Sequence, residues 1–357
     1  MLTPLLLIRG EEDGADALLG EFDLSAWDAL FAEEAPDVGF TPSDFAYAIA
    51  DASVDADDGL FNRLTGALIP ALKTAAGKGV LLLGLAVFAA LLNGVQGPAA
   101  SETAQTAFRI VTAGAALLSV AAGMREAYRT VSAAGDAVGI VLPVLLGFLT
   151  FGGMENSALA VSASFSLYTG TVLRVLRTTV MPLACAGGIF AALDVSETAR
   201  VASVGRLLQR AARWVLGVTG SLFGVLNALR GAAAAGADGY LLRTVKLAAG
   251  SLPAVGGMAA ASAETVYQCL MLARNAIGLT GVALLVLIAA RPVLSMFFTR
   301  CALRCARALS EPLAGRPYAE LLRALSDTMQ ILLLSELIAY GLPVLAIAPA
   351  LRVGGYA

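Results

Sequence analysis

Long apolar segments recur along most of this chain, and they constrain its fold more than any other feature. A helix needs roughly 20 predominantly apolar residues to cross a bilayer upright. Several of the segments are shorter than that, so some neighbouring pairs are candidates for re-entrant, broken helices. The sequence therefore predicts an all-α, polytopic integral membrane protein. About eight spans are expected, at residues 79–95, 106–124, 138–151, 158–173, 178–193, 214–229, 276–298 and 329–350.

Charge is distributed unevenly along the sequence. Apolar residues make up 58% of the chain and charged residues 14%, whereas a soluble domain carries about 25% charged residues. Residues 1–58 hold 15 of the 27 acidic residues and one base, and residues 59–357 hold 12 acids and 23 bases. We therefore expect an acidic extracytoplasmic region over residues 1–58 and a multi-span membrane domain over residues 59–357. The lipid bilayer is an expected partner, and this charge pattern does not suggest nucleic-acid binding.

The acidic region shows helical periodicity. Apolar side chains recur in it at near-helical spacing with carboxylates between them, at Leu18, Phe22, Trp27, Leu30 and Phe31. The run Thr-Pro-Ser-Asp at residues 41–44 is typical of a helix start, with threonine as the cap and proline at the first helical position. Two interpretations remain open for this region, a defined helical hairpin and a solvated tether.

The stretch from Leu242 to Gly281 is apolar, yet it contains residues that interrupt a helix or carry charge. These are Pro253, Gly256, Gly257, Glu264 and Arg274. Irregular backbone at membrane depth must be shielded by protein or line a wet cavity. We therefore predict a broken, small-residue hairpin here, with longer helices packed around it.

Two arginine stripes indicate the orientation in the membrane. The arginines of each stripe recur at helical spacing, at Arg206, Arg210 and Arg213 and again at Arg300, Arg304 and Arg307. Such stripes are typical of helices at the cytoplasmic leaflet. Placing both stripes inside, with eight spans, puts the acidic region and the C-terminus outside. Arg174 and Arg177 then fall on the wrong side, which conflicts with this topology.

An internal repeat is a further candidate feature. Residues 128–135 lead to Leu142-Pro143, and residues 242–250 lead to Leu252-Pro253, each followed by a small-residue apolar segment. Paired broken helices occur in transporter folds that are built from repeats. Chance similarity in a chain rich in alanine, glycine and leucine is the alternative explanation.

Ionisable residues inside apolar segments are candidates for function, because charge at membrane depth is costly. Glu264 and Arg274 either line a polar path or lie at the two ends of a short helix, facing the headgroups. A pair between Arg291 and Glu336 would neutralise both charges, although the sequence does not show that they meet.

Glycines at residues 217, 220 and 224 give one helix a thin face, which allows close helix approach in lipid. These and the preceding positions are candidates for packing, gating or a polar path. The full set is Pro143, Pro253, Gly256, Gly257, Glu264, Arg274, Arg291, Glu336, Gly217, Gly220 and Gly224.

No catalytic, cofactor or metal site is recognisable in the sequence. It contains no histidine, and its four cysteines lack metal-ligand spacing. Phosphate-binding loops and the common hydrolase motifs are absent. We therefore expect neither an enzyme nor a cofactor, and energy from a nucleotide would have to come from a partner subunit. An intramembrane enzyme that uses Glu264 or Glu336 is the weakest alternative, because no second catalytic group has a recognisable spacing.

Three short runs resemble the stage III sporulation protein AE family. They are the LRTVK run at residues 242–246, the Gly-x-Leu-Pro turn at residues 250–253 and the run AIGLTGVA at residues 276–283. The resemblance extends from about Phe40 to the C-terminus and is much weaker outside these runs.

The resemblance implies a function. Proteins of this family are components of the trans-envelope complex that links the mother cell to the forespore during endospore formation. The chain would be a multi-pass subunit of this channel or secretion-like apparatus in the mother-cell membrane around the forespore. Its implied partners are the other stage III A sporulation proteins, including an ATPase subunit, and stage II sporulation protein Q through the complex. The alternative is an autonomous secondary transporter with its site at the broken Leu-Pro helices.

Overall fold

The described residues of the computed structural model fold into long helices. These residues are 19–20, 23–34, 41–50, 102–151, 154–193, 202–250, 256–314 and 316–352, with a few single positions between 69 and 84. No strand occurs among them, which confirms the all-α prediction for this part of the chain. The helices are α2 (Ser25–Glu34), α3 (Pro42–Ala50), α5 (Glu102–Phe151), α6 (Glu155–Leu167), α7 (Leu173–Val175), α8 (Met181–Leu193), α9 (Ala202–Gly250), α10 (Gly256–Ala314) and α11 (Arg316–Arg352). Two π-helical segments, η2 (Tyr168–Val172) and η3 (Leu176–Val180), join α6, α7 and α8 into one run.

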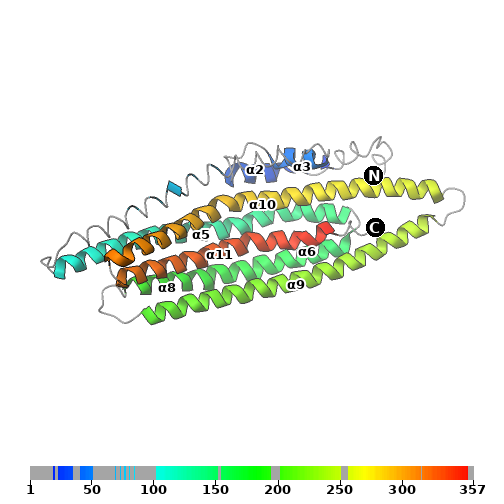
Figure 1. The fold of residues 1–357 in the computed structure, drawn as a ribbon. Coiled ribbons are helices and arrows are strands. Elements are labelled where there is room, and N and C mark those ends of the chain that lie inside the picture. The colour runs from blue at the N-terminus through cyan, green and yellow to red at the C-terminus, as the bar shows by residue number, and fades with distance from the viewer. Residues whose placement is uncertain are drawn as a thin grey trace.

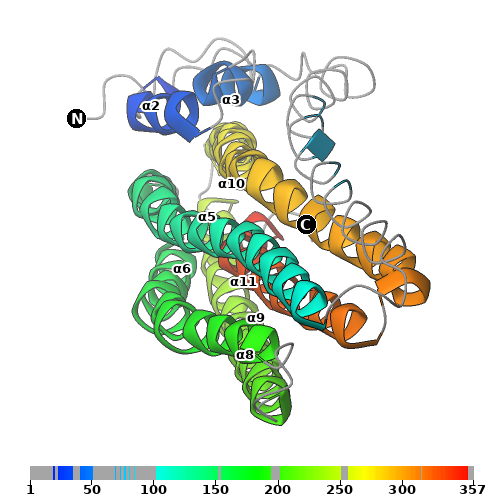
Figure 2. The same ribbon diagram turned by 90° about the vertical axis from the view of Figure 1, so that its left-hand side faces the viewer.

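The long helices lie side by side in an elongated bundle, with α2 and α3 on its outside along α10 (Figure 1). Helix α11 is the central element, since it contacts α5, α6, α8, α9 and α10. The end-on view in Figure 2 shows α11 between α5, α9 and α10. The last long helix of the chain, rather than the stretch at residues 242–281, therefore organises the bundle.

In the part of the chain that the structure describes, five helical stretches are long and apolar enough to cross a membrane. They are Val120–Phe151, Glu155–Phe190, Ser203–Arg230, Ala276–Ala308 and Ala319–Ile347. The structure thus does not confirm the prediction of about eight spans. The one span predicted at residues 79–95 lies mostly outside the described residues.

Two pairs of predicted spans are in fact single helical runs. The spans expected at residues 106–124 and 138–151 both lie in α5, and those at 158–173 and 178–193 both lie in the run from α6 to α8. The charged residues between the members of each pair suggested loops, yet the helical backbone continues through them. A helix satisfies its own backbone hydrogen bonds, so its backbone can continue through charged positions, even though Arg125, Arg129, Asp136 and Arg174 are exposed.

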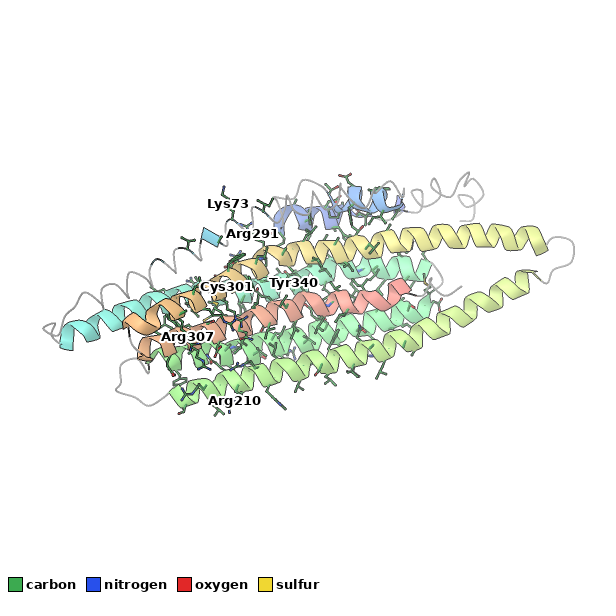
Figure 3. The ribbon with its side chains drawn as sticks, in the orientation of Figure 1. Lys73, Arg210, Arg291, Cys301, Arg307 and Tyr340 are labelled. Carbon is green, nitrogen blue, oxygen red and sulfur yellow. The ribbon has the colours of Figure 1, made fainter. Side chains whose placement is uncertain are left out.

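The long run from α6 to α8 also resolves the conflict over Arg174 and Arg177. Both arginines lie in the middle of one candidate span, so they are not loop residues on the wrong side of the membrane. The two arginine stripes lie at one end of the bundle, where Figure 3 shows Arg210 of α9 and Arg307 of α10. Their expected placement on one side of a membrane is consistent with this arrangement.

The hairpin predicted at residues 242–281 is formed by the end of α9 and the start of α10. These two helix ends extend beyond α5, α6 and α11 (Figure 1), so longer helices do not surround the hairpin as predicted. The reason is length: α9 has 49 residues and α10 has 59, and at about 1.5 Å per residue both exceed the thickness of a bilayer.

The candidate internal repeat is not confirmed. Its first half lies within α5, which continues unbroken past Pro143, whereas its second half reaches the end of α9 at Gly250. Pro143 is exposed on α5, and the missing N–H of a proline is tolerated in membrane helices when neighbouring groups compensate. The Leu142-Pro143 pair therefore does not mark a broken helix.

The acidic region contains a defined helical hairpin. The backbone N–H of Asp44 donates to Oγ1 of Thr41 over 3.2 Å, and α3 begins at Pro42, which confirms the predicted cap. The Asp28 carboxylate joins the two helices by accepting bonds from Ser43, over 3.0 Å from its N–H and 2.8 Å from its hydroxyl. Trp27 is fully buried and donates from Nε1 to the carbonyl of Ile140 in α5 over 3.3 Å. This packing favours the hairpin interpretation over the solvated tether.

Candidate functional site

The centre of α11 carries polar residues in the interior of the bundle. Ser335 and Glu336 are both fully buried. The Ser335 hydroxyl donates to the carbonyl of Ile331 within its own helix over 2.9 Å. Neither carboxyl oxygen of Glu336 has a hydrogen-bond partner. Buried polar groups are almost always hydrogen-bonded, so this carboxyl group is an exception that needs an explanation.

Tyr340 connects this part of α11 to α5. Its hydroxyl donates to the backbone carbonyl of Thr130 over 3.3 Å. The Thr130 hydroxyl in turn donates to the carbonyl of Glu126 over 2.9 Å. Nearer the basic end of the same interface, Met329 fills the space beside Gly123, where an added Cβ would lie 2.6 Å from the methionine Cε. The contacts of Met329 and Tyr340 fix the register of α11 against α5.

Tyr168 connects α11 to the run from α6 to α8. It is fully buried, and its hydroxyl donates to the carbonyl of Ala339 over 2.6 Å. Tyr168 is also the first residue of the π-helical segment η2. Such segments within α-helices often occur at functional sites, because they shift side chains away from regular helical positions.

The second π-helical segment places a cation beside α5. Arg177 in η3 donates from Nη2 to the carbonyl of Val131 over 3.3 Å. Close approach of the two helices depends on Gly135, where an added Cβ would lie 2.9 Å from Cδ1 of Leu173. The π-helical segments therefore bring one tyrosine and one arginine to the interior side of their helix.

We define the central polar cluster as Glu126, Thr130, Tyr168, Glu336 and Tyr340. All five lie inside candidate membrane spans, and they come from α5, η2 and α11. Figure 3 shows Tyr340 in the middle of the bundle. Ionisable groups at this depth mark ion paths, proton relays or ligand sites in membrane proteins. The cluster is therefore the candidate functional site.

Glu336 is the one predicted site residue that lies in this cluster. The pair with Arg291 that the sequence left open does not form, because Arg291 is exposed on α10 and no hydrogen bond reaches the Glu336 oxygens. Arg291 is instead exposed on its helix, and a long arginine side chain inside a membrane span can extend its charge towards the membrane surface.

The predicted residues of the central hairpin lie elsewhere. Gly256, Gly257, Glu264 and Arg274 belong to the first part of α10, whereas Pro253 lies outside the described residues. Because α10 continues to Ala314, Glu264 and Arg274 do not mark the two ends of a short helix. Figure 1 shows this part of α10 at the end of the bundle, away from the centre of α11.

The three glycines predicted to form a thin face of α9 have different surroundings. A Cβ added at Gly220 would lie 3.2 Å from Cδ1 of Ile338 in α11, whereas Gly217 and Gly224 have nothing within 4 Å. Of these three glycines, only Gly220 therefore brings α9 close to another helix in the described part of the chain.

Sequence reasoning missed the two tyrosines and the two amides that fix α11. Gln209 in α9 donates to the Ala324 carbonyl and to Oγ1 of Thr328, each over 2.9 Å. Asn227, also in α9, donates to the Leu345 carbonyl over 2.7 Å. The sequence could have indicated Tyr340, because it follows Glu336 by one helical turn in an apolar helix and so lies on the same helix face.

Comparison with known proteins agrees with the resemblance found in the sequence. The family model described as Stage III sporulation protein AE matches residues 48–354. The chain is 28% identical over 257 residues to the stage III sporulation protein AE of Bacillus subtilis (strain 168). That alignment covers 70% of this chain and 64% of the relative, slightly less than two thirds of the relative's length. No solved structure matches the chain. Because the family model spans most of its residues, this chain belongs to the stage III sporulation protein AE family.

Proposed function

We propose that this chain is a membrane-embedded subunit of the channel or secretion-like complex that crosses the envelope between mother cell and forespore. Membership of the stage III sporulation protein AE family carries the proposal. The five apolar helices support a position in a membrane, and the family membership suggests that this is the mother-cell membrane around the forespore. The chain is not an enzyme in this proposal, and a partner ATPase provides the energy.

The proposed partners are the other stage III A sporulation proteins and, through the complex, stage II sporulation protein Q. Helix faces that could receive such partners exist on α9, where Trp214, Leu222 and Leu229 are exposed. In the experiment, the gene is deleted in a sporulating cell and a tagged copy is restored. Cells without the protein should complete engulfment and then fail in forespore development, and the tagged protein should co-purify with other membrane components of the operon. Normal spore yield together with purification as a lone monomer would contradict the proposal.

The proposal includes an orientation, with the basic end of the bundle in the cytoplasm. Ser203 lies at the start of α9 near the arginine stripe, and Glu155 lies at the start of α6 at the opposite end. Both are exposed. In a variant without its native cysteines, Glu155→Cys should react with a membrane-impermeant thiol reagent added to intact cells. Ser203→Cys should react only after permeabilisation, and the reverse pattern would refute this orientation.

An autonomous secondary transporter is the second candidate function, and the buried Glu336 favours it. Transporters place ionisable groups in the middle of their helices, where these groups bind coupling ions. Of the site expected at the Leu-Pro pairs, the Pro143 half does not fit, because Pro143 lies in an unbroken helix, and Leu252-Pro253 lies outside the described residues. Gradient-driven uptake by the purified protein in liposomes, without partners, would favour the transporter over the complex subunit.

A further inference from the structure

Glu336 differs from every other charged residue in the described part of the chain, because it is fully buried and has no hydrogen bond to either oxygen. An ionised carboxylate in such surroundings costs many kcal/mol unless a cation or several donors compensate. The charged groups and hydrogen-bond donors around Glu336 therefore determine whether its carboxylate binds a proton or a metal cation.

Helix α5 contributes a second carboxyl group to this interface. Glu126 is half-buried and lies close enough to Glu336 for their negative charges to repel each other. The register supports this placement, since Gly123 lies beside Met329 and Thr130 accepts the bond from Tyr340. On α5, Glu126 lies between Gly123 and Thr130. On α11, Glu336 lies between their partners Met329 and Tyr340. The two carboxyl groups thus share the α5–α11 interface.

Three donors around this interface bond to backbone carbonyls, although Nε of Arg177 is buried without a hydrogen-bond partner. Tyr340, Tyr168 and Arg177 donate to the backbone carbonyls of Thr130, Ala339 and Val131. The carboxylates of Asp136 in α5 and Glu34 in α2 add further negative charge around the side chain of Tyr340.

The remaining helices around α11 supply no compensating cation in the described part of the chain. Helix α9 presents the uncharged amides of Gln209 and Asn227, which bond to α11 at other levels. On α10, Arg291 is exposed. The arginine stripe of α10 lies at the basic end of the bundle, together with the early part of α11.

We propose that Glu336 is a proton-binding site in the core of the membrane bundle, with Glu126 as the group through which the proton enters. The proton leaves a carboxyl oxygen of Glu126 and binds a carboxylate oxygen of Glu336, so that the charge of the pair is unchanged by the transfer. Glu126 suits the entry role because it is partly exposed while Glu336 is fully enclosed.

The chemistry of the site favours a proton over a metal cation. Hard cations such as Ca²⁺ take roughly 6–8 oxygen ligands, whereas no group of three or more acidic, histidine or cysteine side chains that could hold a metal ion occurs in the described part of the chain. A proton needs only one carboxylate oxygen. Two neighbouring carboxylates do not readily ionise together, so a single bound proton relieves their repulsion. This inference rests on the bundle alone and not on the proposed partners.

The test uses dicyclohexylcarbodiimide, an apolar reagent that reacts with protonated carboxyl groups in membrane proteins. The full chain is purified, placed in lipid nanodiscs and treated over a range of pH, and the modified residues are mapped by mass spectrometry. We expect an adduct on Glu336 that decreases as the pH rises. The adduct should be lost in Glu336→Gln and retained in Glu320→Gln, since Glu320 is an exposed glutamate of the same helix near Arg206.

The Glu126→Gln variant tests the entry role. Removal of the repelling carboxylate should move the loss of the Glu336 adduct to lower pH and slow its formation. An unmodified Glu336 at acidic pH in the wild-type protein would overturn the proposal, even if Glu336→Gln fails to fold. Protection of Glu336 by Na⁺ at constant pH would also overturn it, because the site would then bind a metal cation.

Discussion

Helices α11 and α9 are both apolar enough to cross a membrane, yet they differ in what surrounds them. In the most apolar stretch of α11, 61% is buried inside the structure, against 22% in α9. On α9, Trp214 is 70% exposed and Leu222 is 58% exposed. The outer face of α9 is therefore open to lipid or a partner subunit, whereas α11 contacts protein on most sides.

The difference shows that apolar content alone does not tell a central helix from a peripheral one. Lipid is as apolar as a protein core, so there is no hydrophobic drive to bury one helix rather than another. Polar residues separate them better. Helix α11 buries Glu336 and Ser335 in its middle, while α9 buries Gln209 and Asn227 only on the face that bonds to α11.

The largest expected contrast between the two helices comes from deleting a leucine side chain. Leu332 on α11 is fully buried and Leu222 on α9 is exposed. Leu332→Ala should lower the free energy of unfolding by about 2–5 kcal/mol, because it leaves a cavity in the core. Leu222→Ala should change it by less than about 0.5 kcal/mol, as for other exposed sites. Reversible unfolding in mixed detergent micelles measures both, and equal losses would remove the distinction between the helices.

A second contrast compares two sites for an added side chain. One is Gly187 of α8, which packs against the inner face of α9, and the other is Gly217 on the outer face of α9. A Cβ at Gly187 of α8 would lie 2.6 Å from Cγ of Gln209 and 3.0 Å from the Gly205 carbonyl oxygen, whereas Gly217 has open space. Gly187→Leu should cost on the order of 1–3 kcal/mol through overpacking. Gly217→Leu should leave the melting temperature of the isolated protein unchanged.

The Gly217→Leu variant also reports on the outer face of α9. If this variant melts normally but no longer co-purifies with partner proteins, the outer face of α9 is a subunit interface. If Gly187→Leu melts like the wild type, the close packing of α8 against α9 is wrong.

The sequence was sufficient to predict the helical class and the helix cap at Thr41, because these depend on local patterns. For the acidic region it left the helical hairpin and the solvated tether both open. The number of spans was not predictable in the same way. Arg174 and Arg177 suggested a loop, since the sequence does not show that Arg177 bonds to Val131 across the bundle. Interior placement depends on such long-range contacts, which local periodicity does not contain.

The candidate site was predicted in one residue and missed in the others for a similar reason. Glu336 stood out because a carboxyl group within an apolar segment is rare. Tyr168 and Tyr340 did not stand out, because tyrosine is common in membrane helices and often lies at the membrane surface. Their role emerges only when their hydroxyls are seen to bond to Ala339 and Thr130 on facing helices.

The smallest expected contrast concerns hydrogen bonds on the two faces of α9. Gln209 is buried and donates to the Ala324 carbonyl and the Thr328 hydroxyl of α11, whereas Ser221 is exposed and donates to the Gly217 carbonyl of its own helix. Interhelical hydrogen bonds in membranes contribute only about 0.6–1.7 kcal/mol, and the Thr328 hydroxyl keeps its own bond to Ala324. Gln209→Leu should therefore destabilise the protein by about 1 kcal/mol, and Ser221→Ala should have no measurable effect. Denaturant titration of both variants in one detergent gives the comparison, and a stability gain in Gln209→Leu would show that apolar packing, rather than this bond, holds α9 against α11.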